Sequence, residues 1–364
     1  MLRGARKALG AARKAARSRM ARSDRRQVAL KDAEIAALRR KLALARGETP
    51  EPAASHAPAF FVVGYQKSGT TWLMHMLDAH PEILCKGEGR FFDAGWRQKG
   101  LRREGVGRPP SSLYHALLDA EYLRFWIERS VWSRDEPARE HLDNLMRMAV
   151  DYFLQGELLK TGKRLAGDKS PLLTPETVKE IAAIYPEARV IHIIRDGRDA
   201  AVSAAYHSWN FGNAARRDAD RAAPEKLREA GRSIFTGGQL EKLASDWNTR
   251  VGRAAEDGPA LLGGHYTEVR YEDLVQNPEE EMDRLLRFLG AGVGEETVKR
   301  CVEAASFEKL AQGRERGEED PSSFFRKGVA GDWRNVFTGE DRKTFEREAG
   351  DLLVKLGYEE GSGW

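Results

Sequence analysis

Short apolar runs alternate with amphipathic segments over most of this 364-residue chain. Phe60–Val63 and Val190–Ile194 are rich in β-branched and aromatic residues, the pattern of strands buried on both faces. Thr267–Tyr271 is a third strand candidate, and Pro278–Gly290 follows it as an amphipathic helix whose inward face is Met282, Leu285, Leu286 and Leu289. Strands that alternate with helices predict a parallel sheet with right-handed crossovers.

Residues 113–160 have the pattern of several helices rather than strands. Their large apolar side chains are the natural candidates for a core, because burial of such groups drives folding. We therefore expect the following side chains to be buried: Trp126, Trp132, Met146 and Phe153.

The first 46 residues differ from the rest of the chain. They are dominated by Ala, Arg, Lys and Leu and contain no proline, which predicts a helix. Val28, Ile35, Leu38 and Leu42 follow spacings of seven, three and four, the seam of a short coiled coil that is marginal on its own. Residues 47–58 contain three prolines and read as a linker, so the predicted units are 1–46, 47–58 and 59–364.

Charge is distributed unevenly between these units. Residues 1–46 carry fifteen Lys and Arg against three Asp and Glu, a local charge of +12 in a chain whose total is +4, which leaves about −8 on the remainder. A basic helix on an acidic body favours self-association or contact with an anionic membrane surface, and a solvated tail is the alternative. We expect no nucleic-acid partner.

Composition limits the class of protein. With 41% apolar and 32% charged residues, the chain suits a soluble globular protein, and no run approaches the roughly 20 apolar residues that span a bilayer. Two cysteines, Cys85 and Cys301, cannot build a disulfide framework, and no Cys or His spacing predicts a metal site. We expect a cytoplasmic protein, peripheral at a membrane if the basic helix binds lipid; an Arg-rich start also fits an organelle transit peptide.

The segment Gly64–Trp72 follows the first strand and opens a helix, a placement that directs backbone N–H groups at an anion. Glycine permits close backbone approach, a lysine stands inside the loop, and hydroxyls add donors. The residues are Lys67, Ser68, Gly69, Thr70, Thr71 and Trp72. A Walker loop has lysine where Thr70 stands, so the loop does not match a Mg²⁺-dependent kinase. The alternative is a glycine turn with a solvated lysine.

Two further segments carry anion-binding residues. Arg195 stands at the carboxyl end of the second strand, and Ser203 lies eight residues on, two turns into the following helix. Both can converge on one phosphate, which arginine contacts with a planar fork. Nearer the end of the chain, Phe325–Thr338 contains Arg326, Lys327 and Gly328, two cations beside a glycine.

Taken together, the three segments resemble the sulfotransferases that use 3′-phosphoadenosine 5′-phosphosulfate (PAPS). Lys67–Trp72 is similar to their 5′-phosphosulfate loop, with Gln66 where proline is common, while Arg195, Ser203 and Arg326–Gly328 resemble their 3′-phosphate site. The resemblance covers roughly residues 60–340. It implies an α/β fold with a P-loop-like central parallel sheet flanked by helices, PAPS as sulfuryl donor, adenosine 3′,5′-bisphosphate as product, and no metal. By the same resemblance Trp72 contacts adenine; the alternative is a core tryptophan.

The acceptor side resembles a different branch. Lys86–Asp93 is similar to the Lys-Glu-x-His-Phe-Phe region of heparan-type glycan sulfotransferases, and Asp168–Pro171 to their Glu-Lys-Ser/Thr-Pro string. The resemblance implies that Glu88 is the catalytic base and that Lys169 joins Lys67 in neutralising the transferred group. Both residues also fit solvated surface positions. His207 is the rival base; His192 is expected in the sheet packing and His75 in the core.

These observations predict a PAPS-dependent sulfotransferase that acts on an acceptor hydroxyl or amine, with a carbohydrate or another small molecule as acceptor and partner. Two alternatives remain. One is a P-loop nucleotide kinase or NTPase; the other is a non-catalytic nucleotide-binding scaffold assembled through the N-terminal helix.

Overall fold

The computed structural model describes residues 59–92, 112–118, 120–133, 136–172, 174–211 and 224–364. Within them, five parallel strands form a sheet in the order β2-β3-β1-β4-β5. The strands are β1 (Ala59–Gly64), β2 (Ile83–Gly87), β3 (Leu165–Pro171), β4 (Arg189–Ile194) and β5 (Tyr266–Arg270). The predicted α/β class is confirmed. The predicted extension and linker, 1–58, lie outside the described residues.

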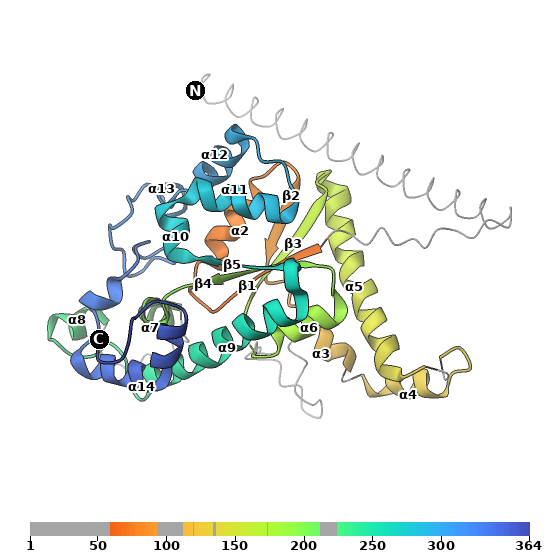
Figure 1. Cartoon of the computed structure of the whole chain (residues 1–364), viewed down its shortest axis with the longest axis horizontal. Coiled ribbons are helices and arrows are strands. Elements are labelled where there is room, and N and C mark those ends of the chain that lie inside the picture. Colours follow the sequence, from red (N-terminus) through yellow and green to blue (C-terminus); the bar gives the residue numbers. More distant parts are fainter. Residues whose placement is uncertain (1–58, 93–111, 119, 134–135, 173, 212–223) are drawn as a thin grey trace, which may run out of the picture.

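Helices cover both faces of the sheet (Figure 1). One face shares a core with α2 (Thr70–Asp78), α10 (Tyr271–Gln276), α11 (Pro278–Leu289) and α12 (Glu295–Ala304). The other shares a core with α5 (Ala138–Thr161), α6 (Thr177–Ile184) and α9 (Gln239–Leu262). A third cluster joins α9 to α7 (Gly197–Phe211), α8 (Pro224–Glu229) and α14 (Gly339–Lys355). Shorter elements are α3 (Leu113–Leu118), α4 (Glu121–Arg129), α13 (Phe307–Leu310), η2 (Gly263–His265) and η3 (Asp332–Asn335).

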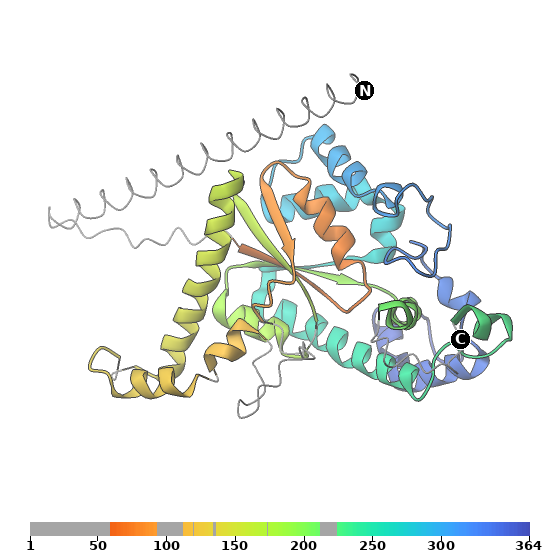
Figure 2. The same ribbon diagram turned by 180° about the vertical axis from the view of Figure 1, so that it is seen from behind.

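Strand β1 explains why the sheet is buried on both sides. Phe60 and Val62 point to the core beneath α2 (orange in Figure 2), whereas Phe61 and Val63 point to the core beneath α5, α6 and α9. Alternation with period two therefore places apolar side chains on both faces of one strand. Gly167 of β3 pairs with Phe60, and a Cβ there would lie 2.1 Å from the Cζ atom of that ring, so only glycine lets the ring cross the neighbouring strand.

The strand order creates a switch point beside β1. The chain passes from β1 to β2 and β3 on one side, and then crosses to β4 on the other side of β1. In open parallel sheets, ligands bind outside the carboxyl ends of the strands at such a point. The segments that leave β1 at Gly64 and β4 at Ile194 therefore begin where a ligand site is expected.

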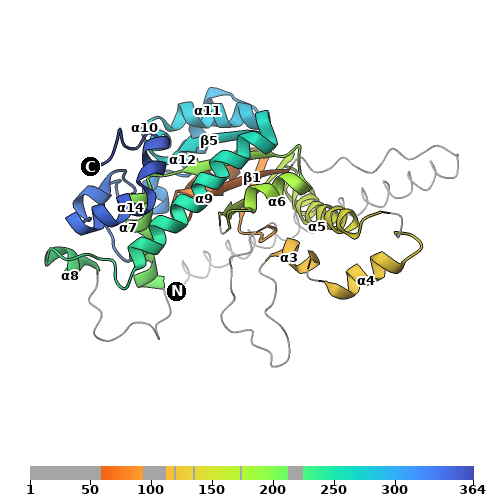
Figure 3. The same cartoon turned by 60° about the horizontal axis from the view of Figure 1, so that its bottom comes forward.

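The structure corrects part of the predicted core. Trp126, Trp132 and Phe153 are exposed, and Met146 is buried, so three of these four expectations are wrong. In the part of the chain that the structure describes, α4 and the adjoining end of α5 extend away from the sheet (Figure 3), so their outer faces do not pack on it. The expected strand at Thr267–Tyr271 is β5, shifted by one residue, and α11 buries the four predicted side chains, Met282, Leu285, Leu286 and Leu289.

Among the described residues, no helix combines the length and the apolarity that crossing a membrane requires.

Candidate functional site

The loop between β1 and α2 has the backbone shape of an anion cradle. Lys67 and Gly69 both have positive φ, 66° and 92°, and the Ser68 amide donates to the Tyr65 carbonyl at 3.1 Å, so the loop turns tightly. Gly69 is the N-cap residue of α2 and brings no side chain to the first-turn amides. A Cβ at Gly69 would also lie 2.6 Å from the Tyr271 ring, which makes glycine necessary here. The N-terminal amides of α2 therefore face the cavity described next.

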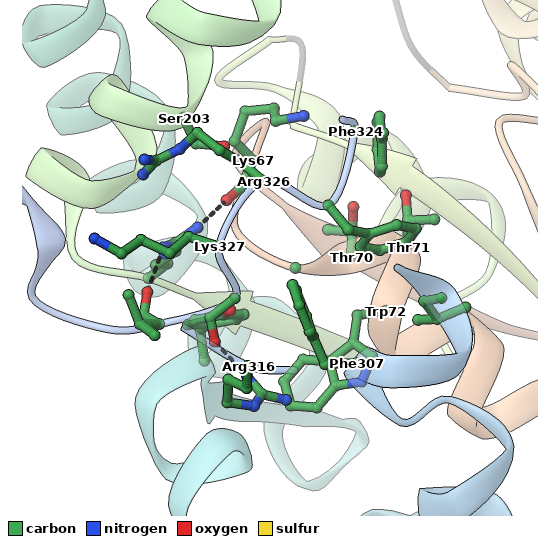
Figure 4. A pocket seen from close by; sticks show the side chains of 17 residues that line it. Lys67, Thr70, Thr71, Trp72, Ser203, Phe307, Arg316, Phe324, Arg326 and Lys327 are labelled. Atoms are coloured by element: carbon green, nitrogen blue, oxygen red, sulfur yellow. Dashed lines mark hydrogen bonds between the residues drawn. The ribbon is translucent and has the colours of Figure 1, made fainter. Parts of the chain in front are cut away.

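A cavity opens beside this loop, and its walls come from segments far apart in the sequence (Figure 4). The structure brings together most of the predicted nucleotide-binding residues around it: Lys67, Gly69, Thr70, Thr71, Trp72, Arg195, Ser203, Arg326, Lys327 and Gly328. Ser68 is fully buried in the loop and does not line the cavity. The remaining lining residues were not predicted as site residues from the sequence: Tyr271, Phe307, Leu310, Arg316, Phe324, Phe325 and Val329.

Arg195 joins three of these segments. One guanidinium nitrogen donates to the Lys67 carbonyl and another to the Val329 carbonyl, each at 3.0 Å. The guanidinium also lies 4.3 Å from the centre of the Tyr271 ring. Its Nε atom is buried and has no hydrogen-bond partner among the described residues. A buried donor without a partner is unusual because it is costly, while Arg195 as a residue lines the cavity.

Arg326 and Lys327 are held in place by carboxylates behind them. Arg326 Nη2 donates to Asp332 at 2.6 Å, Lys327 Nζ donates to the other oxygen of Asp332 at 2.7 Å, and Arg326 also donates to Glu319. Burial raises the pKa of Asp332, but hydrogen bonds from Lys327 and Arg326 outweigh it, so the net pKa lies below its usual range. Like that of Arg195, the Arg326 Nε is buried without a partner in the described chain.

The neighbouring Arg198 and Asp199 are structural. Arg198 donates to Asp196 and Glu359 and stacks on Trp333, with 3.8 Å between the guanidinium carbon and the ring centre. Asp199 accepts from the amides of Gly331 at 2.6 Å and Trp333 at 2.9 Å. Asp199 thereby fastens the distant segment that carries Arg326.

Aromatic side chains form the opposite part of the cavity. Trp72 donates from Nε1 to the Ala305 carbonyl at 2.8 Å and meets the Tyr271 ring edge-on at 5.6 Å between centres. The Arg316 guanidinium lies 5.1 Å from the Trp72 ring centre and 5.5 Å from that of Phe307. Trp72 is thus both packed and part of the cavity wall, which suits a planar ligand group.

Glu88 and Lys169 form an ion pair, with 2.9 Å between Nζ and Oε1. They lie at the carboxyl ends of adjacent strands, because Gly87 of β2 pairs with Lys169 of β3. Lys169 is buried, whereas Glu88 is exposed and has a φ of 60°. Neither residue lines the cavity.

Asp168 shapes the turn that carries Glu88. One of its oxygens accepts from the Gly89 amide at 2.9 Å, and the other accepts from the Ser170 hydroxyl at 2.9 Å. Burial raises the pKa of this carboxyl group. A Cβ at Gly89 would lie 2.9 Å from Asp168 Oδ1, so the backbone and the carboxylate are in close contact.

Lys67 connects the two parts of the site electrostatically. Its pKa is lowered to about 8 by burial and, to a smaller degree, by the charges of Arg195 and Lys169. Its Nζ lies 4.0 Å from the centre of the Phe324 ring. Lys67 and Lys169 are therefore electrostatic neighbours, and Lys169 in turn pairs with Glu88.

The rival histidines lie in different surroundings. His75 is exposed on α2, so its expected place in the core is wrong. His192 is buried in β4 with Nδ1 2.7 Å from the Tyr266 hydroxyl, and burial lowers its pKa to about 3. His207 on α7 meets Phe324 edge-on at 5.8 Å; burial and then the charge of Lys67 lower its pKa to about 4. Of the three, His207 is the one beside Lys67.

Clusters of three or more His, Cys, Asp or Glu side chains able to hold a metal ion do not occur in the part of the chain that the structure describes. Cys85 and Cys301 are both buried and free.

A match to a known family model shows to which family the chain belongs. Residues 58–295 match the family model described as "Sulfotransferase family", which covers well over half of the chain. The chain belongs to the sulfotransferase family. The resemblance found in its motifs is thereby confirmed.

Individual relatives of this sulfotransferase are distant. It is 29% identical to rat Sulfotransferase 1A1 over 78% of the chain and 80% of the rat protein. It is 27% identical to Nodulation protein NoeE of Sinorhizobium fredii over 82% of the chain and 66% of that protein. Alignments to the further curated relatives from mouse, cattle and dog span between 52% and 66% of their lengths.

Solved structures of sulfotransferases also match over most of the chain, at lower sequence identity than the curated relatives. The sulfotransferase domain of the curacin biosynthetic pathway matches with a TM-score of 0.47 and 16% identity, over 84% of this chain and 99% of that one. Retinol dehydratase in complex with retinol and PAP matches with a TM-score of 0.45 and 20% identity, over 82% of each chain. The family match ends at residue 295, so Arg326–Gly328 are joined to this site by the geometry of the sulfotransferase itself.

The lowered pKa of Lys67 predicts an unusual pH dependence of its reactivity. Only the neutral amine reacts with electrophiles, so labelling should rise with a midpoint near pH 8, where this ammonium loses its proton, rather than near the ordinary pKa of about 10.4. Quantitative mass spectrometry after short reductive methylation at a series of pH values measures this midpoint. The Lys67→Arg variant is the control that must lack the labelled site. A midpoint above pH 10 would contradict the burial described here.

Proposed function

We propose that this sulfotransferase binds PAPS in the cavity and transfers its sulfuryl group to a hydroxyl or amine, with a carbohydrate as acceptor. The observation that carries the proposal is the meeting of Lys67, Arg195 and Arg326 from three separate segments around one cavity, two of them with a buried, unpaired Nε. A ligand that is anionic at two places compensates the positive charge of these three side chains.

In this proposal, the nucleotide lies between the β1 loop and the C-terminal segment. The 5′-phosphosulfate takes the amides at the start of α2 with the Thr70 and Thr71 hydroxyls, and the 3′-phosphate takes Arg195, Ser203 and the Arg326–Gly328 segment. The adenine packs against the rings of Trp72 and Phe307 and the Arg316 guanidinium that lies beside both. Each of these groups lines the same cavity (Figure 4).

The chain's own residues then serve the transfer. The acceptor oxygen or nitrogen forms a bond to sulfur while the bond from sulfur to the 5′-phosphate oxygen breaks, and adenosine 3′,5′-bisphosphate leaves. Glu88 accepts the acceptor's proton, and its ion pair with Lys169 fixes its direction. Lys67 and Lys169 stabilise the negative charge that grows on the bridging oxygen and the transferred group.

A carbohydrate acceptor is supported by the acceptor side of the site. The Glu88–Lys169 pair stands at the ends of two adjacent strands, in strings similar to those of glycan sulfotransferases. Glu88 is exposed, which leaves room for a polar acceptor to approach. Solved structures of retinol dehydratase are complexes with retinol or with androsterone, so lipids belong in the acceptor panel below.

The kinase and scaffold alternatives make different predictions for ligand binding. A kinase or NTPase requires ATP with Mg²⁺ and a Walker lysine, and Thr70 occupies that position. A scaffold binds nucleotide without turnover. The partner surfaces predicted for residues 1–46, a second copy or an anionic membrane, remain predictions, as does the cytoplasmic location.

Nucleotide binding can be tested by calorimetry with a matched pair of ligands. Lys327→Ala should weaken adenosine 3′,5′-bisphosphate about tenfold to a hundredfold, since a charge-assisted hydrogen bond contributes about 1.5–3 kcal/mol. Adenosine 5′-monophosphate, which lacks the 3′-phosphate, should lose little. Lys355→Ala, on α14 and paired with Glu256, is the control. Tight binding of ATP–Mg²⁺ with none of adenosine 3′,5′-bisphosphate would sink the proposal.

The role of Glu88 is tested by separating turnover from binding. Glu88→Gln should lower the turnover number by roughly 10²–10⁴ because the base is lost. Its affinity for adenosine 3′,5′-bisphosphate should stay within about threefold, since Glu88 does not line the cavity. Glu340→Gln, at an exposed position on α14, is the control. If Glu88→Gln turns over normally while His207→Ala does not, the base is His207.

The acceptor class is tested with ³⁵S-labelled PAPS and a panel of glycans, phenols and lipids. We expect label on a glycan, at a rate at least tenfold above the best phenol, with the Glu88→Gln protein as the inactive control. Identification of the product by mass spectrometry then names the sulfated atom. Transfer to phenols alone would overturn the carbohydrate proposal while leaving the sulfuryl transfer intact.

A further inference from the structure

Arg314, which follows α13, uses its guanidinium group to bind backbone carbonyls. Its Nη1 donates to the carbonyls of Glu318 and Arg326, each at 3.0 Å, and its Nη2 donates to the Phe325 carbonyl at 2.7 Å. Its ion pair with Asp320 is longer, with 4.0 Å between Nε and Oδ2. The planar fork of arginine is suited to carboxylates and phosphates, so its use on peptide groups indicates that it holds a loop in shape.

The next two carbonyls of this loop bind the same segment. The Gly317 amide donates to the Lys327 carbonyl at 2.9 Å, and Arg316 donates from Nη1 to the Gly328 carbonyl. We call the donor segment, residues 314–317, the arginine turn. Four consecutive carbonyls of the loop thus accept hydrogen bonds from the arginine turn.

This bonding orients the peptide groups beside the cavity. In a trans peptide the N–H points opposite to the C=O, and the described residues contain no cis peptide bond. The amides of residues 326–329 therefore point away from the arginine turn, and these four residues line the cavity. Gly328 has a φ of 70°, the left-handed conformation in which successive amides form a concave anion site. The bonds to the turn therefore decide which donors the loop can present to a phosphate.

The arginine turn also contacts the aromatic wall of the cavity. The Phe307 ring centre lies 5.7 Å from the guanidinium carbon of Arg314 and 5.5 Å from that of Arg316 (Figure 4). A Cβ at Gly328 would lie 2.4 Å from Cδ2 of the same ring, so the ring packs directly on the loop backbone. The turn, the ring and the loop therefore form one packed unit.

The backbone of the turn has an uncommon conformation. Gln312, Gly313 and Gly317 have φ values of 60°, 97° and 103°. A residue other than glycine is rare in this region and persists there where surrounding contacts impose it. The Gly313 amide donates to the Glu308 carbonyl at 2.7 Å, which ties the turn to α13. These features make the turn a fixed support for the loop.

We propose that Arg314 is a positioning residue for the 3′-phosphate: it holds the 326–328 loop in the shape that binds this group and does not itself contact the nucleotide. Arg314 is absent from the cavity lining, whereas all three residues of the loop belong to it. The inference rests on the proposed function, in which this loop takes the 3′-phosphate. A support of this kind acts on the 3′-phosphate, whereas a free charge would attract either end of the nucleotide.

Calorimetry with two ligands separates positioning from charge. Arg314→Ala should weaken adenosine 3′,5′-bisphosphate about tenfold, the lower end of what loss of an outer-shell partner costs at metal sites. Adenosine 5′-monophosphate should stay within about threefold, because the substitution is not coupled to a group that this ligand lacks. Arg314→Lys keeps the charge but loses the fork, so it should also weaken adenosine 3′,5′-bisphosphate selectively. Arg287→Ala, on α11 and paired with Asp283, is the control.

Hydrogen exchange followed by mass spectrometry tests the support without any nucleotide. The amides of Gly317 and Asp320 both donate to carbonyls of the loop, at 2.9 Å. Once Arg314 no longer holds the loop, local opening should make these amides exchange about tenfold faster in both variants. The amides of α11 should exchange as in the wild type, and unchanged circular dichroism shows that the variants are folded.

Three results would overturn the positioning role. The first is wild-type discrimination between the two ligands in Arg314→Lys, which would leave only an effect of charge. The second is an equal loss of affinity for both ligands in Arg314→Ala, and the third is unchanged exchange at Gly317 and Asp320. A wild-type protein that binds neither ligand would instead overturn the proposed function itself, and the positioning role with it.

Discussion

Mutual repulsion of cations is the constraint on which this site depends. Five cationic side chains line the cavity, namely Lys67, Arg195, Arg316, Arg326 and Lys327, and no carboxylate lies among the lining residues that the structure describes. The compensating acids stand one layer behind. Asp332 and Glu319 hold the C-terminal pair, and Asp199 lies 3.8 Å from Arg195. Among the described residues, no acid lies within bonding distance of Lys67, and burial, with smaller contributions from the charges of Arg195 and Lys169, lowers its pKa to about 8. In the proposed function, an anionic ligand compensates the positive charge that these carboxylates do not neutralise.

Much of this arrangement could be predicted from the sequence because it is local. The β1 loop, Arg195 with Ser203, and Arg326–Gly328 are contiguous strings whose chemistry does not depend on knowing the rest of the fold. The parallel sheet follows from alternating strand and helix patterns. These strings did not predict that Tyr271, Phe307 and Arg316 line the cavity, because the three residues lie in segments without a recognisable motif. Tyr271 opens α10, Phe307 opens α13 and Arg316 lies after α13, so only the tertiary fold brings them to the cavity.

The failed core expectations have a single physical cause. Trp126, Trp132 and Phe153 are as hydrophobic as Met146, but hydrophobicity alone does not say which surface a helix meets. On α5, two apolar stripes share one helix, and the sequence gives no means of deciding which one faces the sheet. The buried stripe is recognised only when β1 and β3 are in place. For the same reason, the exposed apolar side chains of α5 could not be recognised as exposed before the fold was known.

The cavity depends on segments that come late in the sequence. The sheet is complete once β5 has ended at Arg270, yet the cavity still lacks Phe307 and the whole 324–329 wall. That wall is fastened by Asp199 to Gly331 and Trp333, and Arg198 beneath it is paired with Glu359, a few residues from the end. A chain shortened before Phe307 therefore retains all five strands but lacks these lining residues. In the proposed function, such a chain lacks part of the site that holds the nucleotide.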